Sequence, residues 1–113
     1  MTSFNQNLLN ENFGDDKEIL IELVDVFFSE LPNMISPIRK SIDENVSADL
    51  HLHAHTLKGA VSNFFAEKCV EHSFELEKMG RSGTIDIERA NSLLKALEAE
   101  LEGLSKDLRD YLT

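Results

Sequence analysis

Residues 47–64 read SADLHLHAHTLKGAVSNF, and the apolar side chains in this stretch recur at intervals of four, three, four and three positions. Such spacing places one apolar residue on the same side of an α-helix at each turn, and it does not fit the two-residue alternation of a half-buried strand. The stretch therefore predicts an amphipathic helix that begins after Ser47 as N-cap and buries one face. The residues of that face are Leu50, Ala54, Leu57, Val61 and Phe64.

A longer apolar stripe lies upstream and predicts a core-facing helix or helix pair. Pro32 and Pro37 interrupt the stripe, and each either kinks the helix or occupies the first turn of a new one, with Ser36 available as the cap before Pro37. Both alternatives stay open at this point. The stripe consists of Leu20, Val24, Phe27, Leu31, Ile35, Ile38 and Ile42.

Two shorter helical segments are expected on either side of these elements. An apolar piece that starts at Phe4 stops near Gly14, where Asp15 and Asp16 suit the start of the long helix through capping and the helix dipole. Another segment runs from about Ala66 to a glycine-containing turn at 80–83, so that its helix ends at residue 80. Its inward positions are Cys69, Val70, Ser73 and Leu76.

The last segment, opened by Thr84 or Asp86 as cap, carries two apolar series at seven-residue spacing. Three heptads could form a coiled-coil dimer. In a chain with three other amphipathic helices, such a stripe is more often the fourth wall of an antiparallel bundle. We therefore predict an all-α fold, an antiparallel four-helix bundle, and a monomer. The two series are Ala90, Leu97, Leu104 and Tyr111, and Leu94, Leu101 and Leu108.

The composition predicts one domain over residues 1–113 and excludes several kinds of partner. With 21 acidic and 11 basic side chains and a formal charge of −10, the chain would repel nucleic acid and anionic membrane surfaces. Its apolar runs are too short to span a bilayer. The single cysteine, Cys69, cannot form an intrachain disulfide, and cytoplasmic localisation follows as the simplest expectation.

Signatures of catalytic chemistry are weak in this sequence. The five glycines form no phosphate-binding loop. Acidic residues such as Asp15, Asp16 and Glu98 are most simply solvated helix faces. Cys69 lies on an apolar stripe, which disfavours a reactive thiolate. The cysteine is therefore interpreted as core packing.

Three of the four histidines fall at positions 51, 53 and 55 of the helix predicted for residues 47–64. At about 100° per residue, His55 points to solvent and His53 points toward the bundle. The exposed side around His55 is mostly small and is the predicted partner-binding surface, with Leu52 as its apolar docking contact. The other members of this surface are Ala48, His51 and Ser62.

Gly59 is the unexpected residue on the exposed side, since a glycine within a helix costs about 0.5–1 kcal/mol relative to alanine. A missing side chain one turn after His55 leaves the imidazole ring accessible to a partner. Lys58, three residues after His55, can place its ammonium beside a group attached to the ring. This arrangement suits nucleophilic phosphoryl transfer, in which a neutral imidazole attacks phosphorus and a lysine offsets the negative charge of the product.

A metal site is the alternative use of these histidines. His51 and His55 are four residues apart and could hold a transition metal, but His53 supplies no third ligand on that side. No metal site is therefore predicted.

Residues 55–60, HTLKGA, resemble the H-x-L-K-G-[SA] signature of histidine-containing phosphotransfer (HPt) domains, the phosphocarriers of two-component phosphorelays. The likeness extends over about residues 15–80 and includes Ala54, Cys69, Leu76-Glu77 and the stretch 16–32. It implies an antiparallel four-helix bundle with one or two short additional N-terminal helices.

The resemblance also implies a role for each residue of the motif. His55 is the phosphoacceptor, Lys58 stabilises the phosphate, and Gly59 keeps the imidazole accessible. Receiver domains of response regulators or hybrid histidine kinases are the implied partners, and they supply the Mg²⁺, so that no cofactor is expected on this chain. The predicted function is a histidine phosphocarrier without independent catalytic activity. The alternative is a helical binding module that docks on or inhibits a kinase or receiver without being phosphorylated.

Two positions depart from the family pattern. Phe65 stands where many members have glycine, so that another residue must make the turn, and Asn63 in a left-handed conformation is the expected one. Pro37 falls where the family tends to continue a helix.

Charge is unevenly distributed along the chain. Residues 47–83, which contain His55, carry four basic and five acidic side chains and are nearly neutral, whereas the flanking segments hold most of the negative excess. A near-neutral segment reduces the repulsion between a phosphorylated histidine and the acidic pocket of a receiver domain.

Overall fold

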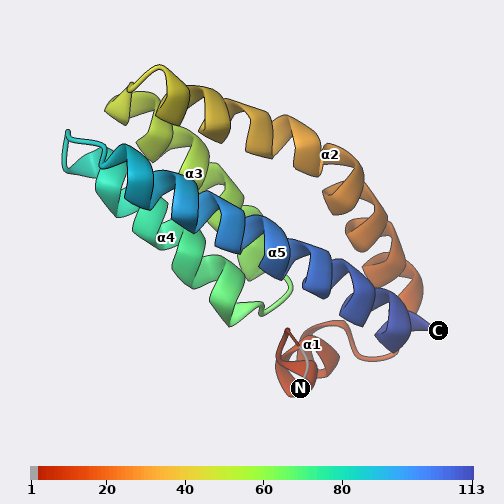
Figure 1. Cartoon of the computed structure of the whole chain (residues 1–113). Helices are drawn as coiled ribbons and strands as arrows, with labels where there is room; N and C mark the ends of the chain where they lie inside the picture. The colour runs from red at the N-terminus through yellow and green to blue at the C-terminus, as the bar shows by residue number, and fades with distance from the viewer. Residues whose placement is uncertain (1–2) are drawn as a thin grey trace.

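The computed structural model describes residues 3–113, and within these residues it contains five α-helices and no β-strand (Figure 1). The predicted fold class, a helical bundle with a short additional N-terminal helix, is confirmed. The helices are α1 (Gln6–Phe13), α2 (Lys17–Asp43), α3 (Ser47–Ser62), α4 (Glu67–Arg81) and α5 (Ile87–Leu112).

Helices α2 to α5 run antiparallel in chain order, and α5 returns to α2 and closes the bundle (Figure 1). Asp86 caps α5 by accepting a hydrogen bond from the Arg89 amide at 3.2 Å. The heptad stripe of α5 packs inside this bundle, because its aliphatic members have their contacts within the chain. The buried members of the stripe are Ala90, Leu94, Leu97, Leu101, Leu104 and Leu108.

Helix α1 covers one end of the bundle. At that end the long helices α2 and α5 extend past α3 and α4 (Figure 1). The side chain of Leu9 is fully buried, and the ring of Phe4 packs edge-on against Tyr111 with 5.5 Å between centroids. The Asn5 amide donates to the carbonyl of Phe65 at 3.0 Å. The N-terminal segment therefore completes the core.

Both prolines lie inside α2, which runs uninterrupted through them. Because proline has no amide hydrogen, the carbonyls four residues before Pro32 and Pro37 receive no helix hydrogen bond from it. Figure 1 shows α2 bending along its length, as helices do when that ladder is interrupted. Asp16 is the N-cap of α2, although its side chain makes no capping hydrogen bond.

The turn between α3 and α4 corrects one prediction. Asn63 has an ordinary right-handed backbone with φ −61°, and Phe65 is the residue in the left-handed region, with φ 56°. A left-handed conformation costs a residue with a Cβ about 1–2 kcal/mol. Packing of the Phe65 ring against the core and the hydrogen bond from Asn5 offset that cost. Tertiary contacts therefore decide this turn against the local preference of asparagine.

Gly80 has a different role from the predicted one. Helix α4 continues through it to Arg81, so that it does not end the helix. A Cβ atom at Gly80 would lie 2.4 Å from the amide nitrogen of His51 and 2.7 Å from the carbonyl oxygen of Ser47. Helices α3 and α4 therefore cross at a backbone separation that only glycine permits. Ser47 itself is the first residue of α3, and the N-cap is Val46, one position earlier than predicted.

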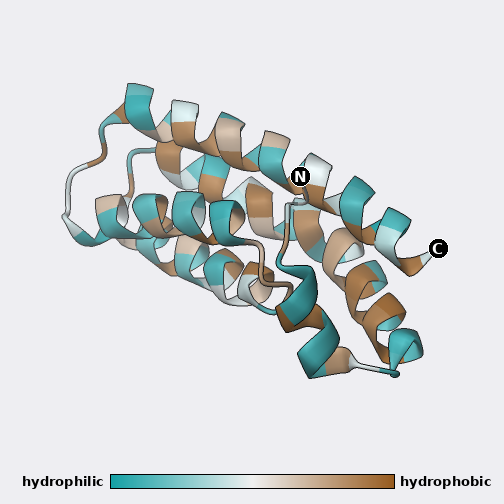
Figure 2. Ribbon diagram, turned by 90° about the horizontal axis from the view of Figure 1, so that it is seen from below, coloured by the Kyte–Doolittle hydropathy of each residue, from teal (hydrophilic) through white to brown (hydrophobic). Residues whose placement is uncertain are grey.

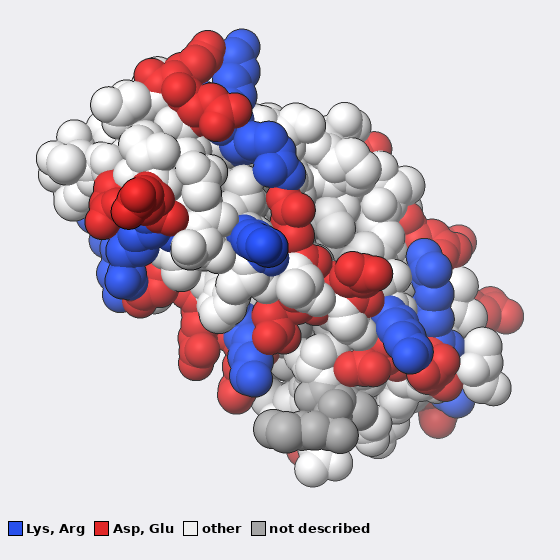
Figure 3. Space-filling view, viewed as in Figure 1, with Lys and Arg blue, Asp and Glu red and all other residues white. Residues whose placement is uncertain are grey.

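The helices also differ in the kinds of side chain that they expose. No helix in the described part of the chain combines the length and hydropathy needed to cross a membrane. On the face seen in Figure 3, acidic and basic side chains are interspersed, and the negative charge of the chain is not gathered into one area there. Helix α2, in contrast, exposes apolar side chains near its start, where Figure 2 shows brown on its visible surface.

Candidate functional site

His55 lies on the outer side of α3, where its side chain is 62% exposed, as the helical wheel predicts. Its Nδ1 atom is 3.2 Å from Oε1 of Glu77 on the neighbouring helix α4. Since Nδ1 faces Glu77, the opposite ring nitrogen, Nε2, lies on the exposed side of the ring. The two nitrogens of this imidazole therefore have different environments.

Glu77 is the buried centre of the site, with a side chain that is 1% exposed. Three groups surround its carboxylate. Oε1 accepts from the His55 ring and lies 2.7 Å from Nζ of Lys58, and Oε2 accepts from Nη2 of Arg81 at 2.7 Å. A buried carboxylate is tolerated only with such partners. The carboxylate therefore holds His55 and Lys58 of α3 next to α4.

The protonation state of Glu77 follows from these contacts. Burial by itself raises the pKa of the carboxyl, but hydrogen bonds from Lys58 and His55 and the positive charge of Lys58 outweigh burial and hold the pKa below its ordinary value. The carboxylate is therefore ionised at neutral pH and can only accept hydrogen bonds. Since the carboxylate offers no donor, the Nδ1 atom of His55 that faces it is the one that donates in this contact.

Sequence reasoning gave Glu77 no role, although Leu76-Glu77 belonged to the stretch that resembles the family. One signal could have identified it. Ser73, four residues earlier, is predicted to point inward, so that Glu77 falls on the same inner face of α4, and both side chains are buried there. An acidic residue on such a face needs a cationic partner from another element.

Lys58 and Gly59 occupy the places that the motif predicts beside His55. The Lys58 side chain is only 25% exposed, because its ammonium turns back to Glu77. Gly59 is exposed, and a Cβ atom there would have no atom of the protein within 4 Å. Internal packing therefore does not require glycine at position 59, in contrast to position 80.

The other predicted partner-binding residues are arranged along the same side of α3. Leu52 is 59% exposed, and Ala48 and Ser62 are exposed about two helical turns, roughly 10 Å, on either side of His55. His51 is half-buried, and its ring lies edge-on to that of His55 with 6.5 Å between centroids. Of these four residues, only Leu52 and His51 thus lie within one turn of His55.

An apolar groove between α2 and α3 adjoins this surface, and sequence reasoning missed it. It encloses about 240 Å³, and Ala60, the neighbour of Gly59, forms part of its wall together with Phe64. On the α2 side it is lined by Leu23 and Val26, whose side chains are unusually exposed for their size. The signal was present in the sequence, because these two residues fall beside the core stripe of α2.

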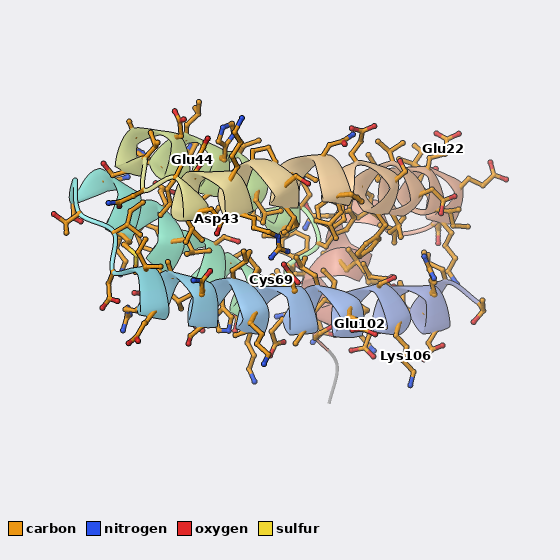
Figure 4. The ribbon with its side chains drawn as sticks, turned by 45° about the horizontal axis from the view of Figure 1, so that its top comes forward. Glu22, Asp43, Glu44, Cys69, Glu102 and Lys106 are labelled. Carbon is orange, nitrogen blue, oxygen red and sulfur yellow. The ribbon has the colours of Figure 1, made fainter. Side chains whose placement is uncertain are left out.

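The remaining chemically active residues do not form a second site. Cys69 is buried between the helices (Figure 4), and burial, followed by the charge of Glu100, raises the pKa of its thiol to about 12. The thiol therefore stays protonated and packs in the core, as predicted. Within residues 3–113, no group of three histidine, cysteine or acidic side chains is placed to hold a metal ion.

A four-helix bundle that exposes one nitrogen of a histidine and holds the other against a buried carboxylate has the features of a histidine phosphotransfer module. A family model described as Hpt domain matches residues 22–107, and the chain belongs to this family. Hpt domains serve in histidine phosphotransfer within phosphorelays. Neither a curated protein nor a solved structure matches the chain at a significant level.

Proposed function

We propose that this chain is a phosphocarrier that accepts a phosphoryl group on Nε2 of His55 and exchanges it with the aspartate of a receiver domain. The observation that carries the proposal is the hydrogen bond between Nδ1 of His55 and the ionised, buried Glu77. It leaves the exposed Nε2 as the nucleophilic nitrogen of a neutral ring.

The transfer step balances with the groups of this site. The electron pair of Nε2 attacks phosphorus, the bond between phosphorus and the aspartyl oxygen breaks, and that electron pair returns to the receiver's carboxylate. The ring becomes a phosphorylated imidazolium that keeps its proton on Nδ1, where Glu77 stabilises the positive charge. In the reverse direction the same hydrogen bond keeps the ring protonated, so that it leaves phosphorus as neutral imidazole.

The positive charges that stabilise the phosphoryl group come from both this chain and the receiver domain. Lys58, three residues after His55 on α3, pairs with Glu77 in the resting state, and in this proposal its flexible side chain turns to neutralise part of the charge of the phosphoryl group. The Mg²⁺ ion belongs to the receiver domain in this proposal, and the carrier contributes no cofactor. A site this exposed suits a protein that must present one atom to successive partners, whereas an enzyme acting on a small substrate would enclose its reacting groups.

The apolar surface beside His55 is the proposed docking area for the receiver. Leu52 and the groove formed by Val26 and Ala60 lie on the side where Gly59 leaves the approach open. Apolar contact there would supply affinity, while the nearly neutral charge of residues 47–83 limits repulsion of an acidic partner. We place this relay in the cytoplasm and expect the carrier to act as a monomer.

Transfer of phosphate from a phosphorylated receiver domain to this chain tests the proposal. The chain is incubated with phosphorylated receiver domains of its source organism, and the product is expected to carry an acid-labile, base-stable phosphate. Peptide mapping should place it on His55, and ³¹P and ¹⁵N NMR should place it on Nε2. Phosphate on Nδ1 or on His51, or no labelling by any receiver, would overturn the assignment.

Glu77→Gln is expected to slow phosphoryl transfer by roughly 10- to 100-fold, because a hydrogen bond to a charged group contributes about 1.5–3 kcal/mol. It should also destabilise the bundle by about 1–3 kcal/mol, since the amide loses the ion pairs with Lys58 and Arg81. Transfer is measured by single-turnover kinetics and stability by urea unfolding.

The pH dependence of the stability difference between the wild type and Glu77→Gln provides the control. The folded-state pKa of Glu77 lies below the ordinary value of 4.5, so its ionised form stabilises the fold above that value, and the contribution is lost as pH falls through the folded-state pKa. The stability advantage of the wild type over Glu77→Gln should therefore shrink below about pH 4.5. A difference that stays constant down to pH 2 would contradict the role assigned to the carboxylate.

Gly59→Ala is expected to raise the stability of the fold and to lower the rate of phosphoryl transfer. A methyl group at this exposed helical position meets no atom of the protein, so it should stabilise the fold by about 0.5–1 kcal/mol. It lies on the surface that the partner approaches, and kcat/KM with a receiver should fall by about tenfold. Transfer at the wild-type rate would show that the partner does not come close to position 59.

A further inference from the structure

Phe74, on α4, is a large aromatic residue that remains 38% exposed beside the phosphotransfer site. It stands one turn before Glu77. Two ammonium groups lie over its ring, with Nζ of Lys58 at 4.6 Å and Nζ of Lys78 at 4.8 Å from the ring centroid. Both distances are within the range of cation–π attraction. The ring therefore contacts the cation assigned to the phosphoryl group.

Lys58 consequently has two attachments, one to a carboxylate and one to an aromatic ring. A lysine side chain on a helix surface has about 2 kcal/mol of rotamer entropy and would otherwise spread over many positions. The ion pair with Glu77 at 2.7 Å and the Phe74 ring together account for its low exposure on an outward-facing helix. They hold the ammonium on the α4 side of His55.

The two attachments differ in what they allow once a phosphoryl group is present. An ammonium that bridges to the phosphoryl group must loosen its bond to Glu77, whose second oxygen keeps its own ion pair with Arg81. Attraction to the ring face is diffuse, so the ammonium can shift and remain in contact. The ring therefore guides Lys58 in both states, whereas the carboxylate competes with the phosphoryl group for it.

We infer that Phe74 is a positioning residue for phosphoryl transfer, which holds the Lys58 ammonium beside His55 through its aromatic face. This inference rests on the proposed phosphocarrier function and adds to it a residue outside the motif. Lys78 shares the ring but is paired with Glu75 at 2.7 Å, so it serves as the internal comparison.

The test is a double-mutant cycle with conservative variants. Phe74→Leu keeps an apolar side chain and removes the aromatic face, and Phe74→Tyr keeps the face. In the wild-type background, Phe74→Leu should lower the transfer rate constant and shorten the phosphohistidine lifetime by about two- to fivefold, and Phe74→Tyr should stay near the wild-type values. In a Lys58→Ala background, Phe74→Leu should have no further effect, while Lys78→Ala should leave the wild-type rate unchanged.

Additive effects of Phe74→Leu and Lys58→Ala would overturn the inference, since Phe74 would then act by another route. The resting contact is checked without phosphorylation. The ε-methylene protons of Lys58 should show a ring-current shift in the NMR spectrum that disappears in Phe74→Leu, and the absence of that shift in the wild type would also overturn the inference. If the wild type accepts no phosphoryl group while the shift is present, the phosphocarrier proposal itself has failed and takes the positioning role with it.

Discussion

Gly80→Ala is expected to destabilise the protein by about 3 kcal/mol or more, at the upper end of the cost of overpacking a core. The new methyl group would lie 2.4 Å from the amide nitrogen of His51 and 2.7 Å from the carbonyl oxygen of Ser47. Both atoms belong to the backbone of α3, so no side-chain rotation can relieve the overlap. Helices α3 and α4 would have to move apart, and small domains have only about 5–15 kcal/mol of stability to lose.

Urea unfolding followed by circular dichroism measures this effect. Gly103→Ala is the matched control, because Gly103 is also within a helix but has open space around its Cβ position. The control should be stabilised by about 0.5–1 kcal/mol through helix propensity alone. Equal stability of Gly80→Ala and the wild type would show that the two helices do not approach as closely as described.

His55→Gln is expected to abolish phosphorylation completely, since the His55 ring is the imidazole that contacts Glu77 beside Lys58. The fold should change little, because the His55 side chain is 62% exposed and the glutamine amide can still donate to Glu77. Labelling by a phosphorylated receiver measures the first effect, and thermal unfolding measures the second. His51→Gln, one turn away, is the matched control and should be labelled at close to the wild-type level.

The outcomes distinguish the two functions that the sequence supports. Loss of labelling with retained binding to the receiver shows a phosphocarrier whose docking surface is separate from its nucleophile. Binding without labelling of the wild type would favour the module that docks on a kinase or receiver and is not phosphorylated. Undiminished labelling of His55→Gln would remove His55 as the acceptor.

Most of the fold could be predicted from apolar periodicity. The stripes of residues 47–64 and 84–113 predicted α3 and α5, and Gly14 marked the end of α1, because each depends on contacts within one helix. The course of α2 through Pro32 and Pro37 could not be predicted, since local geometry allowed both a kink and a new helix. The left-handed position at Phe65 was misassigned because a contact with the N-terminal segment, distant in sequence, stabilises it.

The residues of the site likewise fall into those that the sequence predicts and those that depend on helix packing. His55, Lys58 and Gly59 lie within five residues, and the helical period alone gives their directions. Glu77 lies 22 residues from His55 along the chain, and its hydrogen bond with the ring depends on how α4 packs against α3. The docking groove likewise depends on the packing of α2 against α3.

The amino-acid sequence is enough to predict that this protein is helical, that His55 faces outward and that a lysine and a glycine accompany it. A helix relates each side chain to its own axis at about 100° per residue, and that relation needs no other part of the chain. Which nitrogen of His55 faces Glu77, where the Lys58 ammonium lies and why residue 80 is glycine follow from the packing of α3 against α4. Each of these depends on the distance between two helices, which is set by the packing of the whole core.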